Sequence, residues 1–480
     1  MERTNHALEP SAWAALHFGE VPLGDIRRTR RLQMIGEALA TEPGVSIPQL
    51  FAHPYDVKAA YRFFAHPEVT PERVQSAHRA WVMEQLETAG TYLLLEDTSD
   101  LDWTGHAPIP GLGPIGNRNE GTQGVRLHSV IAARWDIHAT VHKTGHRPCV
   151  DLLGLAHQHY HRRVPRPVGE KNDASSARKR RERESLRWLR SGEALGAAPK
   201  DVRWVRVGDA EADIYEYLHS AQRQGHGFVV RAGQNRVLIA QDGQRVGLLH
   251  KTVRQASALG QCPLELSARP GQAARTATLR ISASAVRLRA PQRPGASAGR
   301  LPPIACTAVR AWEATPPQGA TPLEWILLCD APVTTFAQAH ECLLHYASRW
   351  LLEDFHKALK TGLGVEKLQL EQATRLFAAA AILSIVALRL VGLREQLRDH
   401  PQRPAEAAGL ESLALEVLRT ATHQPLHTLA EVALAIGRLG GHLNRRKDGP
   451  PGWITLWRGM KKLDLLVQGV RLARKLPGFG

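Results

Sequence analysis

The sequence predicts an α/β protein in which a central core of strands and helices is flanked by helical regions at both ends. Between residues 71 and 370, short apolar runs typical of buried strands alternate with segments of helical periodicity. Alternating strand patterns and turns rich in proline and glycine fill residues of about 235–330. We expect about three domains: a helical domain at 1–70, a core at 71–370 with a β-rich insertion, and a helical domain at 371–480.

The central region opens with the order of elements of a ribonuclease H-like fold, namely three strands, a helix, a strand, a helix and a strand. The expected strands cover residues 92–96, 125–135, 148–156, 202–207 and 227–230, with a basic helix at 177–190 before the fourth strand. Many α/β domains begin in a similar way, so this order gains weight only from the acidic residues beside it.

Three of these acidic residues are candidates for catalysis. Asp97 and Asp209 lie at the ends of two predicted strands, and Glu353 lies on a later predicted helix. In a ribonuclease H-like fold, carboxylates so placed converge on one point. Cleavage of a phosphodiester needs an activated nucleophile and a neutralised leaving oxygen, which two divalent ions can supply together. Because hard cations prefer carboxylate oxygens, we expect this triad to bind two Mg²⁺ ions, for which Mn²⁺ could substitute.

A predicted helix over residues 346–362 presents one polar face. Its five members follow at steps of three, four, four and three residues and share an arc of roughly 80°: Tyr346, Arg349, Glu353, Lys357 and Lys360. Arginine binds phosphate as a fork and lysine as a point charge, and Trp350, Leu351 and Leu352 should pack the opposite side inward. A solvated face with i,i+4 ion pairs is the alternative interpretation.

The spacing Tyr-x2-Arg-x3-Glu-x6-Lys resembles the signature of the insertion-sequence-four family of DDE transposases, and within it the transposon-five type. The resemblance runs from residues 23–25 to residues 453–457. The family pattern of a strand followed by Glu-Asp-Thr selects Asp97 over Asp100 and Asp102 as the ligand. Asp213 is expected at a helix start or as a cap, and Asp354 off the face of Glu353.

The resemblance implies further roles for named residues. Trp325 would stack on a base flipped out of the duplex during hairpin formation, and Arg231 would contact a phosphate beside the active site. Residues 1–70 would bind the transposon ends, and the C-terminal region would provide dimer contacts. Two departures stand out: Asp209 lacks the basic neighbour common in the family, and an aromatic pair after Gly124 is replaced by residues 125–126.

The charge of the chain favours a polyanionic partner. The sequence has 62 Lys and Arg against 46 Asp and Glu, a formal net charge of +16. Nucleic acid is the commonest partner of such a surface, although a GC-rich genome alone can also give an arginine-rich chain. Arg27, Arg28 and Arg30 lie in a cluster that we expect to contact DNA, the alternative being a solvated helix surface.

Composition also indicates the compartment. The five cysteines form no CxxC pair, which argues against a zinc site and a disulfide framework and suits a reducing cytosol. The first residues lack the apolar core of a signal peptide, and the longest uncharged run, 376–388, is too short to span a bilayer. We expect a bacterial cytoplasmic, nucleoid-associated protein without membrane contact.

Together these features predict a cut-and-paste DNA transposase that acts as a homodimer on paired transposon ends and joins them to target DNA. One alternative is a catalytically silent DNA-binding derivative, against which the intact triad argues. The other is a stand-alone metal-dependent nuclease of the same fold, which would not need the arginine-rich N-terminal region.

Overall fold

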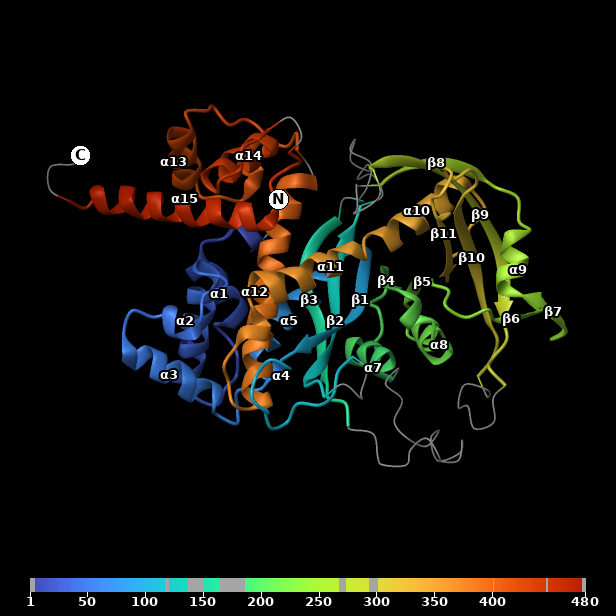
Figure 1. Ribbon diagram of the computed structural model, residues 1–480, viewed down its shortest axis with the longest axis horizontal. Helices are drawn as coiled ribbons and strands as arrows, with labels where there is room; N and C mark the ends of the chain where they lie inside the picture. Colours follow the sequence, from blue (N-terminus) through green and yellow to red (C-terminus); the bar gives the residue numbers. More distant parts are fainter. Residues whose placement is uncertain are drawn as a thin grey trace.

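The computed structural model describes residues 5–116, 121–136, 148, 150–164, 186–266, 273–292, 301–399, 401–445 and 448–476. A large mixed sheet lies at its centre, with the N-terminal helices (blue) and C-terminal helices (red) gathered on one side and the strands of residues 237–329 on the other (Figure 1). The α/β class with helical regions at both ends is therefore confirmed.

Strand β1 (Gly90–Asp102) lies between β4, with which it pairs in parallel, and β2, with which it pairs antiparallel. The neighbouring strands lie in the order β3-β2-β1-β4-β5. Their bounds are β2 (Gly124–Trp135), β3 (Val150–His161), β4 (Val202–Gly208) and β5 (Gly227–Arg231), with α7 (Leu186–Leu195) before β4 and α8 (Tyr215–Arg223) after it. The expected order of elements is present, although residues 177–185 of the predicted basic helix lie outside the described residues.

The segment between β5 and the last part of the core extends the same sheet. Its strand β11 pairs antiparallel with β5, and the order continues β11-β10-β9-β6-β7, with β8 also paired to β9. The elements are β6 (Val237–Ile239), β7 (Arg245–Leu248), α9 (Leu249–Arg254), β8 (Gly260–Leu266), β9 (Arg275–Leu288), β10 (Ile304–Glu313) and β11 (Glu324–Cys329). The β-rich composition expected for this segment is thus present as an extension of the central sheet.

Alternation along the strands divides the core between the two faces of the sheet. Val229 of β5 belongs to the main apolar core, whereas its neighbours Phe228 and Val230 belong to a second cluster that includes Trp188 of α7 and Tyr217 of α8. Successive side chains of a strand point to opposite faces, so a strand that is apolar throughout needs cover on both. Helices α7 and α8 cover one face of this part of the sheet.

Helix α12 (Ala373–Asp399) lies against β3, where the rings of Tyr160 and Phe377 stack at 5.0 Å between centroids. By length and composition the segment Ala373–Arg398 could cross a membrane, but 89% of its most apolar stretch is buried inside the protein. That burial is the property of a central core helix, as expected from the sequence of residues 376–388.

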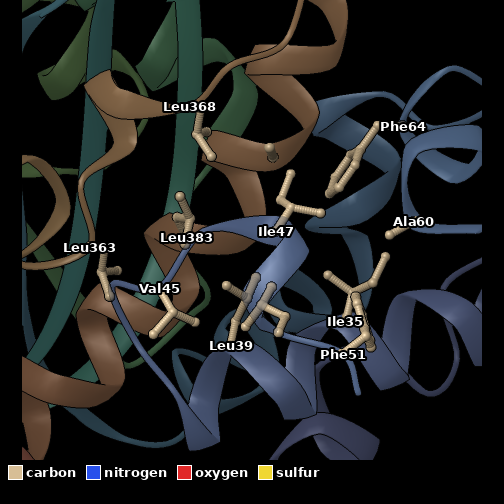
Figure 2. Close-up of a pocket in the computed structure, with 12 residues that line it drawn as sticks. Ile35, Leu39, Val45, Ile47, Phe51, Ala60, Phe64, Leu363, Leu368 and Leu383 are labelled. Carbon is tan, nitrogen blue, oxygen red and sulfur yellow. The ribbon is translucent and has the colours of Figure 1, made fainter. Parts of the chain in front are cut away.

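The N-terminal helices pack onto this core through apolar side chains. They are α1 (Pro10–Phe18), α2 (Ile26–Thr41), α3 (Pro54–Phe64), α4 (Pro71–Val74) and α5 (Ser76–Gln85). Figure 2 shows side chains of α2 and α3 directed toward Leu363, Leu368 and Leu383. The cavity between them measures about 20 Å³, and all the residues that line it are apolar. It is a packing gap with room for about one water molecule.

The C-terminal helices form a separate apolar cluster with the end of α12. They are α13 (Ser412–Thr422), α14 (Leu429–Leu439) and α15 (Trp453–Ala473). Helix α15 extends away from the sheet (Figure 1). Three leucines of this helix, Leu465, Leu466 and Leu472, are 59%, 43% and 61% exposed. Exposed leucines at this density mark a surface that another apolar surface can cover.

Three buried histidines join the N-terminal helices to β3. His6 Nε2 donates to the carbonyl of Leu152 at 2.8 Å, and His78 Nε2 accepts from the amide of Leu155 at 2.9 Å. His78 therefore carries its proton on Nδ1 and donates to His17 Nδ1, 3.1 Å away. Burial lowers the pKa of His6 to about 4 and that of His78 to about 3. All three are neutral near pH 7.

Stability should fall as the pH drops below about 6.5. The unfolded histidines bind protons below their ordinary pKa, whereas the folded ones do not until lower pH, so the unfolded state is favoured by about 1.4 kcal/mol per pH unit for each such histidine. His6→Gln keeps a donor for Leu152 but cannot titrate. Urea unfolding between pH 7.5 and 5 should therefore show a shallower loss of stability for this variant, and equal slopes would contradict the assignment.

Candidate active site where the pairing of β1 and β4 ends

The register of the parallel strands brings the two predicted aspartates together. Leu95 of β1 lies opposite Val207 of β4. Asp97 and Asp209 each follow two residues later, so they reach the same level where the pairing of the two strands ends. Asp209 follows β4 directly, but Asp97 lies inside β1, which continues to Asp102 against β2. The prediction that the first strand ends before Asp97 is therefore wrong. Gly208 lies opposite Val230 of β5, which places the exposed Arg231 at the same edge one strand further along.

A polar depression of about 500 Å³ opens at this edge of the sheet. The segment that follows α10 (Phe336–Ala347) supplies its other wall, through α11 (Trp350–Lys357) and a π-helical turn (Ala358–Gly362). The residues that line it are Asp97, Thr98, Ser99, Asp209, Glu211, Arg349, Glu353, His356, Lys357, Lys360 and Thr361. The three predicted carboxylates and three of the four other predicted residues of the 346–362 segment are therefore brought together.

The prediction of one continuous helix over residues 346–362 is wrong. Helix α10 ends at Ala347, and the amide of Arg349 bonds to the carbonyl of Tyr346 three residues back at 3.1 Å. This tightened turn leaves Tyr346 on a different helix, half-buried against the main core and outside the lining of the depression in the described part of the chain. The prediction that Trp350 packs inward is also wrong, because this side chain is 47% exposed.

Arg349 links two of the carboxylates directly. Its guanidinium donates to Asp97 Oδ2 at 2.9 Å and to Glu353 Oε1 at 3.1 Å. Burial raises the pKa of Asp97 to about 6, the charge of Arg349 opposes that rise, and the nearby carboxylates of Asp209 and Glu353 add to it. The three acids therefore share one electrostatic site in which like charges repel and a cation is favoured.

The donor set suits a hard divalent cation, because it consists of carboxylate oxygens at an open, polar edge. Within the described residues, no three Asp, Glu, His or Cys side chains are gathered closely enough to hold an ion as they stand. The guanidinium of Arg349 lies between Asp97 and Glu353 and supplies positive charge there. The carboxylates of the three acids thus fit the expected metal, but two of them, Asp97 and Glu353, are bonded to Arg349.

The neighbouring acids are engaged elsewhere. Asp100 pairs with Arg126 at 3.2 Å, and Asp354 pairs with an arginine of α12 at 2.8 Å. Asp213 lies just before the start of α8, as expected, but its side chain does not cap that helix. It is buried, pairs with Arg236, and accepts from two backbone amides at 2.7 and 2.9 Å in the loop after β5. Its role is to hold that loop.

A buried ion pair beneath the site escaped the sequence analysis. Glu96 and Arg206 have fully buried side chains and meet at 2.5 Å between Oε1 and Nε. Glu96 also accepts from the hydroxyls of Tyr217 at 2.9 Å and Ser191 at 2.8 Å. The charge of Arg206 holds the pKa of Glu96 below its ordinary value despite burial. The only feature of the sequence that indicated burial is the spacing of Glu96, which follows the buried Tyr92 and Leu94 at steps of two residues.

The remaining predicted DNA contacts lie apart from the depression. Arg30 is exposed and the Arg27 side chain is 89% exposed, but Arg28 donates to the carbonyl of Leu23 at 2.7 Å and contacts a ring nitrogen of His66 at 2.9 Å.

Trp325 of β11 is half-buried against the core. The amide of residue 232 bonds to the carbonyl of residue 326, which puts Trp325 beside the carboxyl end of β5, at the same edge as the acids.

Family models match the two ends of the chain. Residues 10–69 match the model described as "Transposase DNA-binding", and residues 414–480 match the model described as "Transposase Tn5 dimerisation domain". The first range covers α1 to α3, including the arginine cluster, and the second covers α14 and α15 and nearly all of α13. These matches support DNA binding, dimer formation and the role of a Tn5-like transposase.

Proposed function

We propose that the protein is a cut-and-paste DNA transposase of the insertion-sequence-four family, which cleaves transposon ends and joins them to target DNA. The observation that carries the proposal is the meeting of Asp97, Asp209 and Glu353 at one depression, in a chain whose two ends match transposase domains. The strand order β3-β2-β1-β4-β5, in which β1, β4 and β5 are parallel, supports a ribonuclease H-like core. Its place of action would be chromosomal DNA in the bacterial cytoplasm.

The triad would hold two Mg²⁺ or Mn²⁺ ions, which when bound would activate the attacking oxygen and neutralise the leaving one. The chain itself supplies orientation and positive charge. Arg349 keeps Asp97 and Glu353 together, and Lys357 and Lys360 line the same depression, where they can hold the phosphates beside the scissile bond. Lys360 also lies 3.7 Å from Glu366, so its ammonium is held toward this edge.

Two residues along the edge would position the DNA end. Arg231 is the last residue of β5, lies at the level of Asp209 and is exposed, which suits a phosphate contact. Trp325 lies beside that strand end and is partly exposed, which suits stacking on a base held out of the duplex. Such a base would support a route in which the freed 3′-hydroxyl forms a hairpin before the end is joined to target.

Isosteric removal of any triad charge should abolish cleavage and leave DNA binding intact. We expect Asp97→Asn, Asp209→Asn and Glu353→Gln each to lower end cleavage by at least about a thousandfold, because the carboxylates act as a unit. The assay uses purified protein, Mg²⁺, and DNA that carries the ends flanking its gene, with excised and target-joined products resolved on a gel.

The products of the same assay separate the candidate functions. Joined products that disappear in Glu353→Gln support the transposase. Excision without joining would indicate a nuclease of the same fold, and binding without excision would indicate a silent DNA-binding derivative. Full cleavage by any one variant would remove that residue from the triad.

The N-terminal arginines should divide into DNA contacts and structural contacts. Arg30→Ala removes an exposed charge, so it should weaken binding to the end DNA and leave the melting temperature unchanged. The slope of log K against log salt concentration should become shallower by about the contribution of one phosphate contact. Arg28→Ala should lower the melting temperature, because it removes the bonds to Leu23 and His66. Gel shifts at two salt concentrations and thermal melts test both, and identical behaviour of the two variants would refute the division.

The exposed leucines of α15 should form part of the dimer interface. A double variant, Leu465→Glu with Leu472→Glu, places charges on two side chains that are 59% and 61% exposed in the single chain and would be buried in the dimer. We expect it to weaken self-association at least about tenfold in sedimentation analysis. Val246→Glu, at a side chain 61% exposed on β7 and outside residues 414–480, is the matched control. An unchanged dimer in the double variant would place the interface elsewhere.

A further inference from the structure

Helix α7 reaches the site through one buried arginine. The side chain of Arg187 is 4% exposed, and its guanidinium bonds to groups that follow each aspartate. Its Nε donates to the hydroxyl oxygen of Thr98 at 2.9 Å, and its Nη2 donates to a carboxylate oxygen of Glu211. Arg187 therefore connects β1, next to Asp97, with the turn after β4.

Each of these partners holds one aspartate by a backbone amide. The amide of Thr98 donates to Asp97 Oδ1 at 2.8 Å. The amide of Glu211 donates to Asp209 Oδ1, also at 2.8 Å. A continuous chain of contacts thus runs from one aspartate to the other through Arg187, which contacts neither of them itself.

The proton on the Thr98 hydroxyl completes the arrangement. Because the hydroxyl oxygen accepts from Arg187, its own proton is free to bond to His128 Nδ1, 3.0 Å away. His128 then carries its proton on Nε2, which faces the carboxylate of Glu96 at 3.5 Å. Burial lowers the pKa of His128, so the ring is neutral and accepts this bond. The contacts of Arg187 therefore extend through Thr98 and His128 to the neighbourhood of the buried Glu96–Arg206 pair.

We infer that Arg187 is a positioning residue, which fixes the orientation of Asp97 and Asp209 relative to each other through Thr98 and Glu211. The inference rests on the proposed function for its effect on catalysis. The geometry requires a planar fork with two donors aimed at two different elements, which arginine provides and lysine does not. Arg187 also places a positive charge near Asp209, whose next residue in the chain is the uncharged Ala210.

The test compares Arg187→Gln and Arg187→Lys with a matched control in the full-length protein. The control is Arg203→Gln, on β4 near its other end, where Arg203 is half-exposed and pairs with Asp330 at 3.4 Å. We expect Arg187→Gln to raise the Mg²⁺ concentration for half-maximal cleavage by at least about tenfold, the scale of outer contacts on metal ligands. Binding to end DNA should stay within about twofold, because Arg187 does not line the depression. Arg187→Lys should recover part of the loss.

A second readout needs no activity. Hydrogen exchange should accelerate in residues 96–100 and 209–213 of Arg187→Gln, because both aspartate-holding amides lose their support, and should stay at the wild-type rate in Arg203→Gln. Unchanged exchange in both segments would overturn the inference. So would a loss of maximal rate at every Mg²⁺ concentration with a matching fall in melting temperature, which indicates a folding role. If the wild-type protein cleaves no DNA, the proposed function fails, and the exchange experiment alone decides whether Arg187 positions the aspartates.

Discussion

The parallel pairing of β1 with β4 is the constraint on which the site depends. Its register puts Asp97 and Asp209 at one level, and the buried Glu96–Arg206 pair crosses the same two strands directly beneath them. Removing either partner of that pair would leave an unpaired charge in the core, at a cost of about 3–5 kcal/mol. The acids that would perform the chemistry therefore lie next to a buried ion pair that makes displacement of these two strands costly.

Arginines around this edge offset the repulsion among the acids in two different ways. Arg349 contacts Asp97 and Glu353 within the depression, where a cation or a phosphate could exchange with it. Arg187 lies behind the edge and bonds to Thr98 and Glu211, the two residues whose amides hold the aspartates. On the proposed function, the first of these charges would interact with substrate, and the second would keep the aspartates in place. The helical ends of the chain match a DNA-binding and a dimerisation domain. In a dimer they would place one DNA end at this edge of each of the two subunits.

Sequence alone identified the parts of the site that depend on local pattern. Asp97 and Asp209 stood out because each follows an apolar run, and Glu353, Lys357 and Lys360 because they share a helical period. The choice of Asp97 over Asp100 and Asp102 came from the family resemblance, as did the grouping of the three acids with this helix. The turn at Arg349 could not be found, since a period of 3.6 residues is equally compatible with two helices that meet there. Glu96 and Arg187 were missed for another reason: such residues are usually exposed, and their burial depends on partners 110 and 89 residues away in the chain.

The most direct test of this account is the binding of Mn²⁺ to the protein on its end DNA, followed by electron paramagnetic resonance. We expect wild-type protein to bind Mn²⁺ and Asp97→Asn, Asp209→Asn and Glu353→Gln each to lose bound metal, because one carboxylate from each of β1, the β4 turn and α11 would share the site. Unchanged Mn²⁺ binding in all three variants would contradict it and would place the metal, and with it the chemistry, elsewhere in the molecule.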